Sequence, residues 1–124
     1  MIRFGMTLML RDDPEAIERY RREHAQAWPA VVARLRDIGI IGMRIYLLDR
    51  RLFMEMDTVD EFDIATGFTS LDEDETYRRW DELMTSLQER APEAAPGEWW
   101  ARMEVVFDLK WFDGDSEPST QFSS

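Results

Sequence analysis

Residues 43–56 read MRIYLLDRRLFMEM, and they hold two runs of strand-forming side chains around a short polar break. Two such runs in succession are typical of a β-hairpin. The first run is apolar on both parities, with Ile45 and Leu47 on one and Tyr46 and Leu48 on the other. Both faces of this sheet are then apolar, so we expect other parts of the protein, a ligand or a partner to pack against each face. Helices would cover one face, and a second copy of the chain or a ligand would cover the other.

On the N-terminal side of the hairpin, the sequence predicts a strand and then a helix. Residues 2–10 alternate apolar with other side chains, and this period of two indicates a strand. Asp13 fits a helix N-cap and Pro14 the first helical position. Apolar or aromatic side chains then recur at helical spacing over residues 17–35, and Gly39 suits the end of that helix. We therefore predict one strand and one long helix before the hairpin.

On the C-terminal side, the sequence predicts further helical segments and a last strand. Residues 58–62, TVDEF, fit a capping box that opens a short helix. A longer helical pattern runs over about residues 72–89, a loop with two prolines follows at 91–97, and alternating apolar side chains at 103–107 indicate a strand. The element order β-α-β-β-α-β is that of a ferredoxin-like α+β fold, an antiparallel sheet with helices on one face.

The composition excludes several classes of chemistry. The 124 residues include no cysteine and one histidine, which rules out disulfides, thiolate metal sites and a multi-histidine metal site within one chain. A net charge of −11 argues against nucleic acid and anionic membranes as partners. No apolar run approaches the roughly 18 residues of a membrane span, and the N-terminus lacks a signal-peptide pattern. The expected compartment is the cytoplasm.

The negative charge is concentrated in the second half of the chain. Residues 1–51 carry 10 Arg against 7 acidic residues, whereas residues 52–124 carry 5 basic residues against 19 acidic ones. The acidic run 72–75 suits the first turn of a helix and lacks the glycine turn and final glutamate of a calcium loop, so we expect no metal. We divide the chain into a folded domain at 1–109 and an acidic tail at 110–124 that is expected to be disordered.

The single histidine is the first candidate for catalysis. His24 lies on the apolar stripe of the first helix, one turn after Tyr20 and one turn before Trp28, so the three side chains project the same way. Imidazole is the natural acid–base group near neutral pH, although a hydrogen-bonded core histidine is an alternative. A hydroxyl and an aromatic ring beside an imidazole suit a small polyol. Trp80 forms either the opposite wall of such a pocket or part of the core.

Residues 20–29, YRREHAQAWP, resemble the Y-x3-H-x3-W-P signature of the L-rhamnose mutarotase family. Further positions match in order as far as Leu109, so the resemblance covers about residues 1–109. Members of this family are small dimeric α+β barrel proteins that interconvert the α and β anomers of a deoxyhexose without a cofactor. The resemblance thus implies a homodimer paired through its sheets, a sugar substrate, no cofactor and a place in rhamnose or related carbohydrate metabolism.

The resemblance also implies roles for individual residues. His24 matches the proton donor of the family, and Tyr20 matches a tyrosine that contacts the substrate. Trp80 matches the first residue of a Trp-Trp pair that walls the sugar site. Two positions depart from the pattern, since the second tryptophan is Asp81 here and a second sugar-contacting tyrosine is Met43. The expected catalytic residues are His24 and Tyr20, and the expected substrate-binding residues are Tyr20, Trp28, Met43, Trp80 and Asp81.

A sugar mutarotase acting on L-rhamnose or a related deoxyhexose is therefore the first hypothesis for the function. Mutarotation requires a proton at the ring oxygen and the loss of one from the anomeric hydroxyl, and positioned acid–base groups contribute about 10² to 10⁴-fold to such steps. Because one fold serves many functions, two alternatives stay open. These are a cofactor-free monooxygenase or isomerase on the same barrel, and a non-catalytic dimeric ligand-binding protein.

Overall fold

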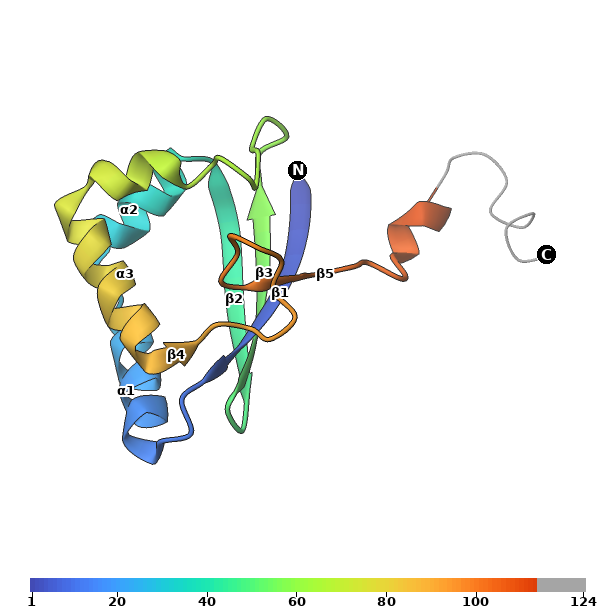
Figure 1. The fold of residues 1–124 in the computed structure, drawn as a ribbon. Helices are drawn as coiled ribbons and strands as arrows, with labels where there is room; N and C mark the ends of the chain where they lie inside the picture. Colours follow the sequence, from blue (N-terminus) through green and yellow to red (C-terminus); the bar gives the residue numbers. More distant parts are fainter. Residues whose placement is uncertain (114–124) are drawn as a thin grey trace.

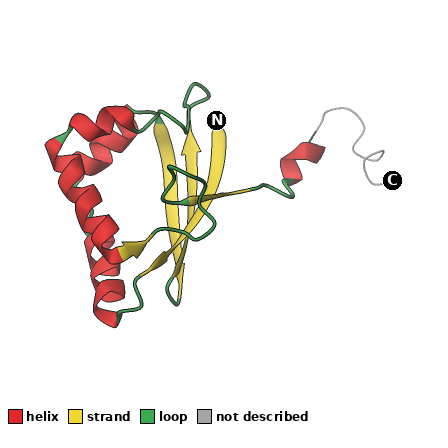
Figure 2. Ribbon diagram, viewed as in Figure 1, coloured by secondary structure: helices red, strands yellow, loops and turns green. Residues whose placement is uncertain are grey.

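A layer of helices covers one face of an antiparallel sheet in the computed structural model of this chain, which describes residues 1–113 (Figure 1, Figure 2). The sheet has the order β2-β3-β1-β4, and β5 also pairs with β1. The strands are β1 (Ile2–Leu10), β2 (Ile40–Leu48), β3 (Arg51–Thr58), β4 (Gln88–Glu89) and β5 (Ala101–Met103). Because β1 lies between β3 and the C-terminal strands, the predicted ferredoxin-like α+β arrangement is confirmed.

The hairpin of β2 and β3 forms as the sequence predicts. Leu48 pairs with Arg51 across a turn in which Asp49 adopts a φ of 57°. The antiparallel register places Leu8 of β1 opposite Leu52 of β3, on the face that the helices cover, and both side chains are fully buried. The alternation seen in the sequence therefore sets which face of the sheet meets the helices.

The first helical segment consists of two helices, so the prediction of one long helix over residues 17–35 is wrong. Helix α1 (Pro14–Ala25) begins at the expected cap, where the Asp13 side chain accepts a hydrogen bond from the Glu15 amide at 3.0 Å. Helix α2 (Pro29–Asp37) starts afresh with proline at its first position. A residue before proline is pushed out of the helical region, and Trp28 has an extended ψ of 126°. Helical spacing continues across the break and conceals it in the sequence.

The segment after β3 also differs from the prediction. No helix opens at residues 58–62, because Thr58 is the last residue of β3 and its hydroxyl donates to the Val59 carbonyl at 3.0 Å instead of capping a helix. The first two residues of the acidic run 72–75 lie in the 3-10 helix η1 (Thr69–Glu73). Helix α3 (Glu75–Leu87) then begins with the Asp74 side chain accepting from the Tyr77 amide at 3.0 Å, and it ends where the chain enters β4.

The last predicted strand is shorter than expected. Strand β5 has three residues, whereas residues 104–108 leave the sheet, and the short strand β4 is absent from the sequence prediction. The chain then forms the 3-10 helix η2 (Leu109–Phe112), which lies away from the sheet on the side opposite the helices (Figure 1). The expectation of a disordered tail mostly concerns residues 114–124, which lie outside the described residues. Within residues 1–113, no helix combines the length and apolar character needed to cross a bilayer.

Candidate active site

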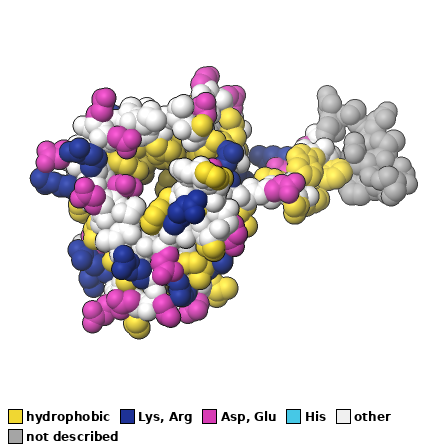
Figure 3. All heavy atoms as spheres, viewed as in Figure 1, with side chains coloured by type: hydrophobic (Ala, Val, Ile, Leu, Met, Phe, Trp, Pro, Cys, Tyr) yellow, Lys and Arg dark blue, Asp and Glu magenta, His cyan; other side chains and the backbone are white. Residues whose placement is uncertain are grey.

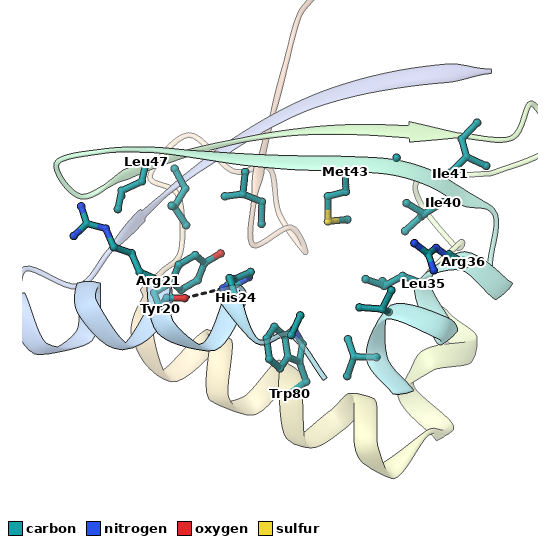
Figure 4. A pocket seen from close by; sticks show the side chains of 16 residues that line it. Tyr20, Arg21, His24, Leu35, Arg36, Ile40, Ile41, Met43, Leu47 and Trp80 are labelled. Atoms are coloured by element: carbon teal, nitrogen blue, oxygen red, sulfur yellow. Dashed lines mark hydrogen bonds between the residues drawn. The ribbon is translucent and has the colours of Figure 1, made fainter. Parts of the chain in front are cut away.

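A cavity of about 470 Å³ lies between the helical layer and strand β2, and Tyr20, His24, Met43 and Trp80 are among its lining residues (Figure 4). A second cavity of about 480 Å³ has the same four residues in its lining and extends toward α3 and the segment before β5. The space-filling view shows the molecule hollowed between helices and sheet, with apolar side chains at the rim (Figure 3). Each volume suits a small organic ligand.

Helix α1 brings the two expected catalytic residues together. Tyr20 and His24 are four residues apart, so they share one face of the helix, and their ring centroids are 4.1 Å apart. Nδ1 of His24 lies 2.9 Å from the Tyr20 backbone carbonyl. A carbonyl oxygen only accepts hydrogen bonds, so Nδ1 carries the hydrogen. In the neutral ring Nε2 is then left with a lone pair that can take a proton.

Burial fixes the charge state of both residues. Desolvation lowers the pKa of His24 below its ordinary value, and the Tyr20 carbonyl and the Glu23 carboxylate oppose this shift in part. Burial raises the pKa of Tyr20 to about 12, against a hydrogen bond from the Gln88 side chain that lowers it. At neutral pH the pair therefore consists of an uncharged imidazole that can accept a proton and a phenol that can donate one.

Trp80 forms a wall beside this pair. Its side chain is 8% exposed, and its ring meets the His24 ring edge-on at a centroid distance of 5.3 Å. The ring of Trp28 meets Trp80 in the same manner at 5.2 Å. Trp28 is absent from the lining of both cavities, so it supports the Trp80 ring from behind.

The two positions that depart from the family pattern both reach the cavities. Met43 of β2 lines both, across from α1, and Asp81 of α3 lines the second one at its exposed rim. Partial desolvation raises the pKa of the Asp81 carboxyl, and the nearby carboxylates of Asp72 and Glu82 raise it further. The pKa of Tyr77 is raised to about 12, mainly by burial and further by the negative charges of Asp81 and Asp72. An acceptor of sugar hydroxyls is therefore available where the family has an aromatic ring.

The sequence prediction missed three residues that line the second cavity, Gln88, Trp99 and Trp100. Gln88 is 5% exposed, and its side chain accepts a hydrogen bond from the Trp99 indole at 2.9 Å. Trp100 packs against the buried residues on the helix-facing side of the sheet. The signal for Gln88 was present, because it continues the i, i+4, i+8 row of Trp80 and Met84. A polar residue at the end of a helical pattern is more often exposed.

No metal site accompanies these residues in the part of the chain that the structure describes. Within residues 1–113, no three or more His, Asp or Glu side chains converge in a way that could hold a metal ion. The side chains that line the two cavities include imidazole, phenol, carboxylate, amide and aromatic groups.

The fold and the cavity define a small α+β protein with an imidazole and a phenol side by side in an aromatic pocket. The chain belongs to the L-rhamnose mutarotase family, whose sequence model matches residues 3–109. This membership confirms the resemblance seen in the sequence and supports sugar mutarotase activity.

Three relatives show how the chain compares with individual proteins. It is 37% identical to a UPF0734 protein of Dictyostelium discoideum, over 88% of this chain and 90% of the relative. It is 34% identical to an L-fucose mutarotase of Xanthomonas campestris pv. campestris, over 88% and 89% of the two chains. It is 31% identical to an L-rhamnose mutarotase of Acidiphilium cryptum, over 68% and 79%.

Two solved structures share the fold. An L-rhamnose mutarotase from Formosa agariphila superposes with a TM-score of 0.65 at 20% identity, covering 88% of this chain and 99% of that one. The tetracenomycin F2 cyclase of Streptomyces glaucescens, a type-II polyketide cyclase, superposes with a TM-score of 0.61 at 16% identity, covering 87% and 96%. At these identities the likeness concerns the fold alone.

Proposed function

We propose that this protein interconverts the α and β anomers of a 6-deoxy-L-hexose, with L-fucose and L-rhamnose as the two sugars to test first. The observation that carries the proposal is the pair of opposite hydrogen-bonding groups at the cavity, the neutral His24 ring and the Tyr20 phenol. The similarity to an L-fucose mutarotase over 88% of the chain adds L-fucose to the sugar that the family name suggests.

The mechanism uses one proton at each of two sugar oxygens. Nε2 of His24 takes the proton of the anomeric hydroxyl, and the bond between C1 and the ring oxygen breaks. Its electron pair stays on the ring oxygen, which takes the Tyr20 proton, while a C1 carbonyl forms. After rotation about the C1–C2 bond, the ring oxygen attacks the other face of the carbonyl, and both protons return. His24 is thus base on opening and donor on closing, as microscopic reversibility requires.

The remaining expected contacts position the sugar. Trp80 offers an aromatic face for the C–H side of the ring, with Trp28 packed behind it. Asp81 would accept a sugar hydroxyl at the rim, and Met43 would contact an apolar edge such as the C6 methyl group. These replacements for family aromatic residues favour a sugar preference that differs from that of rhamnose-specific members.

A homodimer that joins the open faces of two sheets is part of the same proposal. On the side opposite the helices, Tyr46 and Phe53 stack at 5.8 Å and Tyr46 is half exposed. The segment after β5 adds the exposed side chains of Val106 and Phe107. Catalysis in the cytoplasm and the division into a domain at 1–109 and a tail at 110–124 stay predictions.

Exchange NMR between the anomers of each sugar tests the function. The protein should accelerate exchange of L-fucose or L-rhamnose, and His24→Ala should lose about 10²-fold or more of the enzymatic rate. Glu18→Gln on the exposed side of α1 is the matched control and should keep the wild-type rate. Oxygen uptake with a polyphenol would instead indicate the monooxygenase alternative. Binding without exchange for every sugar would indicate a non-catalytic protein.

A further inference from the structure

The end of helix α3 places two polar side chains in the second cavity that take no part in the proposed proton transfers. Thr85 and Gln88 both line this cavity, and its lining also includes His24 and Tyr20. Thr85 and Gln88 are three residues apart, and the Gln88 backbone amide donates to the Thr85 carbonyl where the helix ends. Side chains one turn apart lie on the same side of a helix, so the two polar groups are neighbours on one wall of the cavity.

A contact with Trp99 fixes the orientation of the Gln88 amide. The Trp99 indole Nε1 donates to Gln88 Oε1 at 2.9 Å. An indole N–H and an amide nitrogen both only donate, so the oxygen is the end of the amide that faces Trp99. The amide nitrogen carries two hydrogens, so it can donate to a ligand whatever else it contacts. Because Gln88 is 5% exposed, a ligand that left this donor unpaired would bind less well.

The loop that carries Trp99 is held by hydrogen bonds of its own. The Ala91 amide donates to the Trp99 carbonyl at 3.0 Å. The Arg90 guanidinium donates to three carbonyls between residues 94 and 98, at 2.7–2.9 Å. The orientation of the Gln88 amide is therefore set before a ligand binds, which reduces the entropic cost of binding.

Thr85 has the opposite role, that of an acceptor. Its hydroxyl donates to the Glu82 carbonyl at 3.2 Å. A hydroxyl has one hydrogen and two lone pairs, so the Thr85 oxygen keeps its lone pairs when the hydrogen is directed to the backbone. Thr85 is half-buried, four residues after the exposed Asp81 and three before the buried Gln88. The polar side chains therefore continue from the rim of the cavity toward its interior.

An acceptor beside a donor is the arrangement that a single hydroxyl group needs, because a hydroxyl can accept one hydrogen bond and donate another. We propose that Thr85 and Gln88 form a subsite that binds one ring hydroxyl of the ligand, with Gln88 as donor and Thr85 as acceptor. L-fucose and L-rhamnose differ in configuration at C2 and C4, so a subsite that fixes one hydroxyl can distinguish them. That the ligand is a sugar rests on the proposed function, whereas the roles of the two side chains do not.

Two substitutions each remove one of these roles with little change in shape. Thr85→Val replaces the hydroxyl by a methyl group. Gln88→Glu keeps an oxygen for the Trp99 indole and replaces the amide nitrogen by an oxygen that does not donate when ionised. Thr85→Val should lower kcat/KM for the preferred sugar about tenfold, the equivalent of one lost hydrogen bond. Gln88→Glu should lower it more, because a carboxylate oxygen repels the hydroxyl oxygen that the amide binds.

Ser86→Ala is the matched control for Thr85→Val. The Ser86 hydroxyl makes the same kind of backbone contact, to the Leu83 carbonyl at 2.6 Å, but Ser86 lines neither cavity. Its loss should leave kcat/KM at the wild-type value. Circular dichroism and thermal unfolding identify the variants that fold, and Thr85→Val carries the test alone if Gln88→Glu does not.

Deoxy analogues of the preferred sugar show whether Thr85 acts on the ligand. One of the 2-, 3- and 4-deoxy analogues should be a poorer substrate for the wild type, because it lacks the hydroxyl that the subsite binds. With that analogue, Thr85→Val should have no further effect, since acceptor and hydroxyl belong to one interaction. An equal loss in Thr85→Val with the parent sugar and with every analogue would show structural support only and would overturn the proposal.

A binding measurement distinguishes the subsite from the proposed function. Methyl glycosides of L-fucose and L-rhamnose have no free anomeric hydroxyl and cannot open, so calorimetric titration measures their binding alone. Thr85→Val should weaken binding of the preferred glycoside about tenfold, and Ser86→Ala should not. If the wild type exchanges no anomers but binds a glycoside through Thr85, the proposed function fails and the subsite stands. If it exchanges anomers and Thr85→Val matches it in both binding and kcat/KM, the subsite fails and the function stands.

Discussion

His24 and Tyr20 differ in hydrogen-bonding role because a backbone contact fixes the tautomer of one and burial keeps the other protonated. The backbone carbonyl of Tyr20 takes the Nδ1 hydrogen of His24, which leaves a lone pair on Nε2, and burial raises the pKa of Tyr20 to about 12, so its hydroxyl keeps its hydrogen. What each residue has left faces the cavity, a lone pair on one and a hydrogen on the other. The same aromatic contact that holds the rings 4.1 Å apart keeps these two groups within reach of one small ligand.

The pH dependence of exchange should report the neutral form of His24. Burial lowers its pKa, so the base form predominates at neutral pH and is lost only as the pH falls through the lowered value. The enzymatic rate should therefore be flat around neutrality and decline in acid, below pH 6.5. Because the pKa of Tyr20 is about 12, no loss is expected between neutral pH and pH 10.

A neighbouring carboxylate provides the control for this profile. Glu23 raises the pKa of His24, so Glu23→Gln should move the acidic decline to lower pH without changing the neutral rate. Exchange NMR between pH 4 and 10, corrected for the buffer-catalysed reaction, measures both curves. A decline that begins above pH 6.5 would contradict the assignment of His24 as a neutral base.

Asp81 should contribute to substrate affinity more than to turnover. It lies on α3 at the exposed rim of the second cavity, whereas the contacting His24 and Tyr20 rings belong to α1. Asp81→Ala should raise KM for the preferred sugar about tenfold, which corresponds to the loss of one charge-assisted hydrogen bond at an exposed site. The value of kcat should change little. Glu82→Gln removes one negative charge from the next residue, which does not line either cavity, and should leave KM unchanged.

The residues of the site divide according to how far their positions depend on local sequence. Tyr20 and His24 could be placed together because helical spacing alone puts them on one face. Trp80 could be proposed as a wall of the same pocket from its helical stripe, with a core position as the alternative, whereas Met43 could be proposed only through the family pattern. Gln88 and Trp99 could not be found, because their contact requires the chain to turn back through the loop at 91–97. The packing of Trp28 against Trp80 could not be predicted either, because Trp28 lies at the break between α1 and α2, and the helical spacing of apolar residues continues across that break.

At the level of elements, local hydrogen-bonding groups decide where each helix and strand ends. The caps at Asp13 and Asp74 begin helices α1 and α3, and both are side chains that accept from backbone amides near the helix start. The hairpin and β1 could be predicted because alternation and register agree. The alternation of Met103, Val105 and Phe107 also predicts a strand, yet residues 104–108 leave the sheet. Alternation indicates that one side of a segment is covered but does not identify what covers it.

Gly39 should be among the costliest glycines to replace. It has a φ of 104° at the end of α2, and a Cβ at this position would lie 2.8 Å from Val59 Cγ2. Gly39→Ala should therefore lower the free energy of unfolding through both backbone strain and a steric clash, by about 2 kcal/mol. Urea unfolding followed by circular dichroism measures the change.

Gly97 isolates the contribution of the backbone. Its φ is 83°, but a Cβ there would meet no atom within 4 Å. Gly97→Ala should lower the free energy of unfolding by about 1 kcal/mol, the cost of the left-handed conformation alone. Equal losses in the two variants would mean that the contact with Val59 relaxes without cost.

For the whole molecule, the asymmetry of the sheet matters most. The helices bury one face, whereas the other carries the Tyr46–Phe53 stack, with Phe53 lying over Gly5 so closely that a Cβ there would be 3.2 Å from its ring. The segment after β5 leaves on this same side (Figure 1). Its side chains of Val106 and Leu109 are 82% and 66% exposed. Apolar side chains gathered on one side of a molecule are typical of an interface.

The homodimer proposed from this asymmetry predicts the mass of the protein in solution. Sedimentation velocity should give twice 14.7 kDa for the wild type. Val106→Asp should return the protein to the monomer mass, because a charge in an apolar interface loses its hydration without gaining a partner. The folded monomer should tolerate the change, since Val106 is 82% exposed. Ser86→Asp adds the same charge on the exposed side of α3 and should leave the dimer intact. A wild-type protein that sediments at 14.7 kDa at 100 μM would contradict the dimer, and the open face would then have to be explained by another partner.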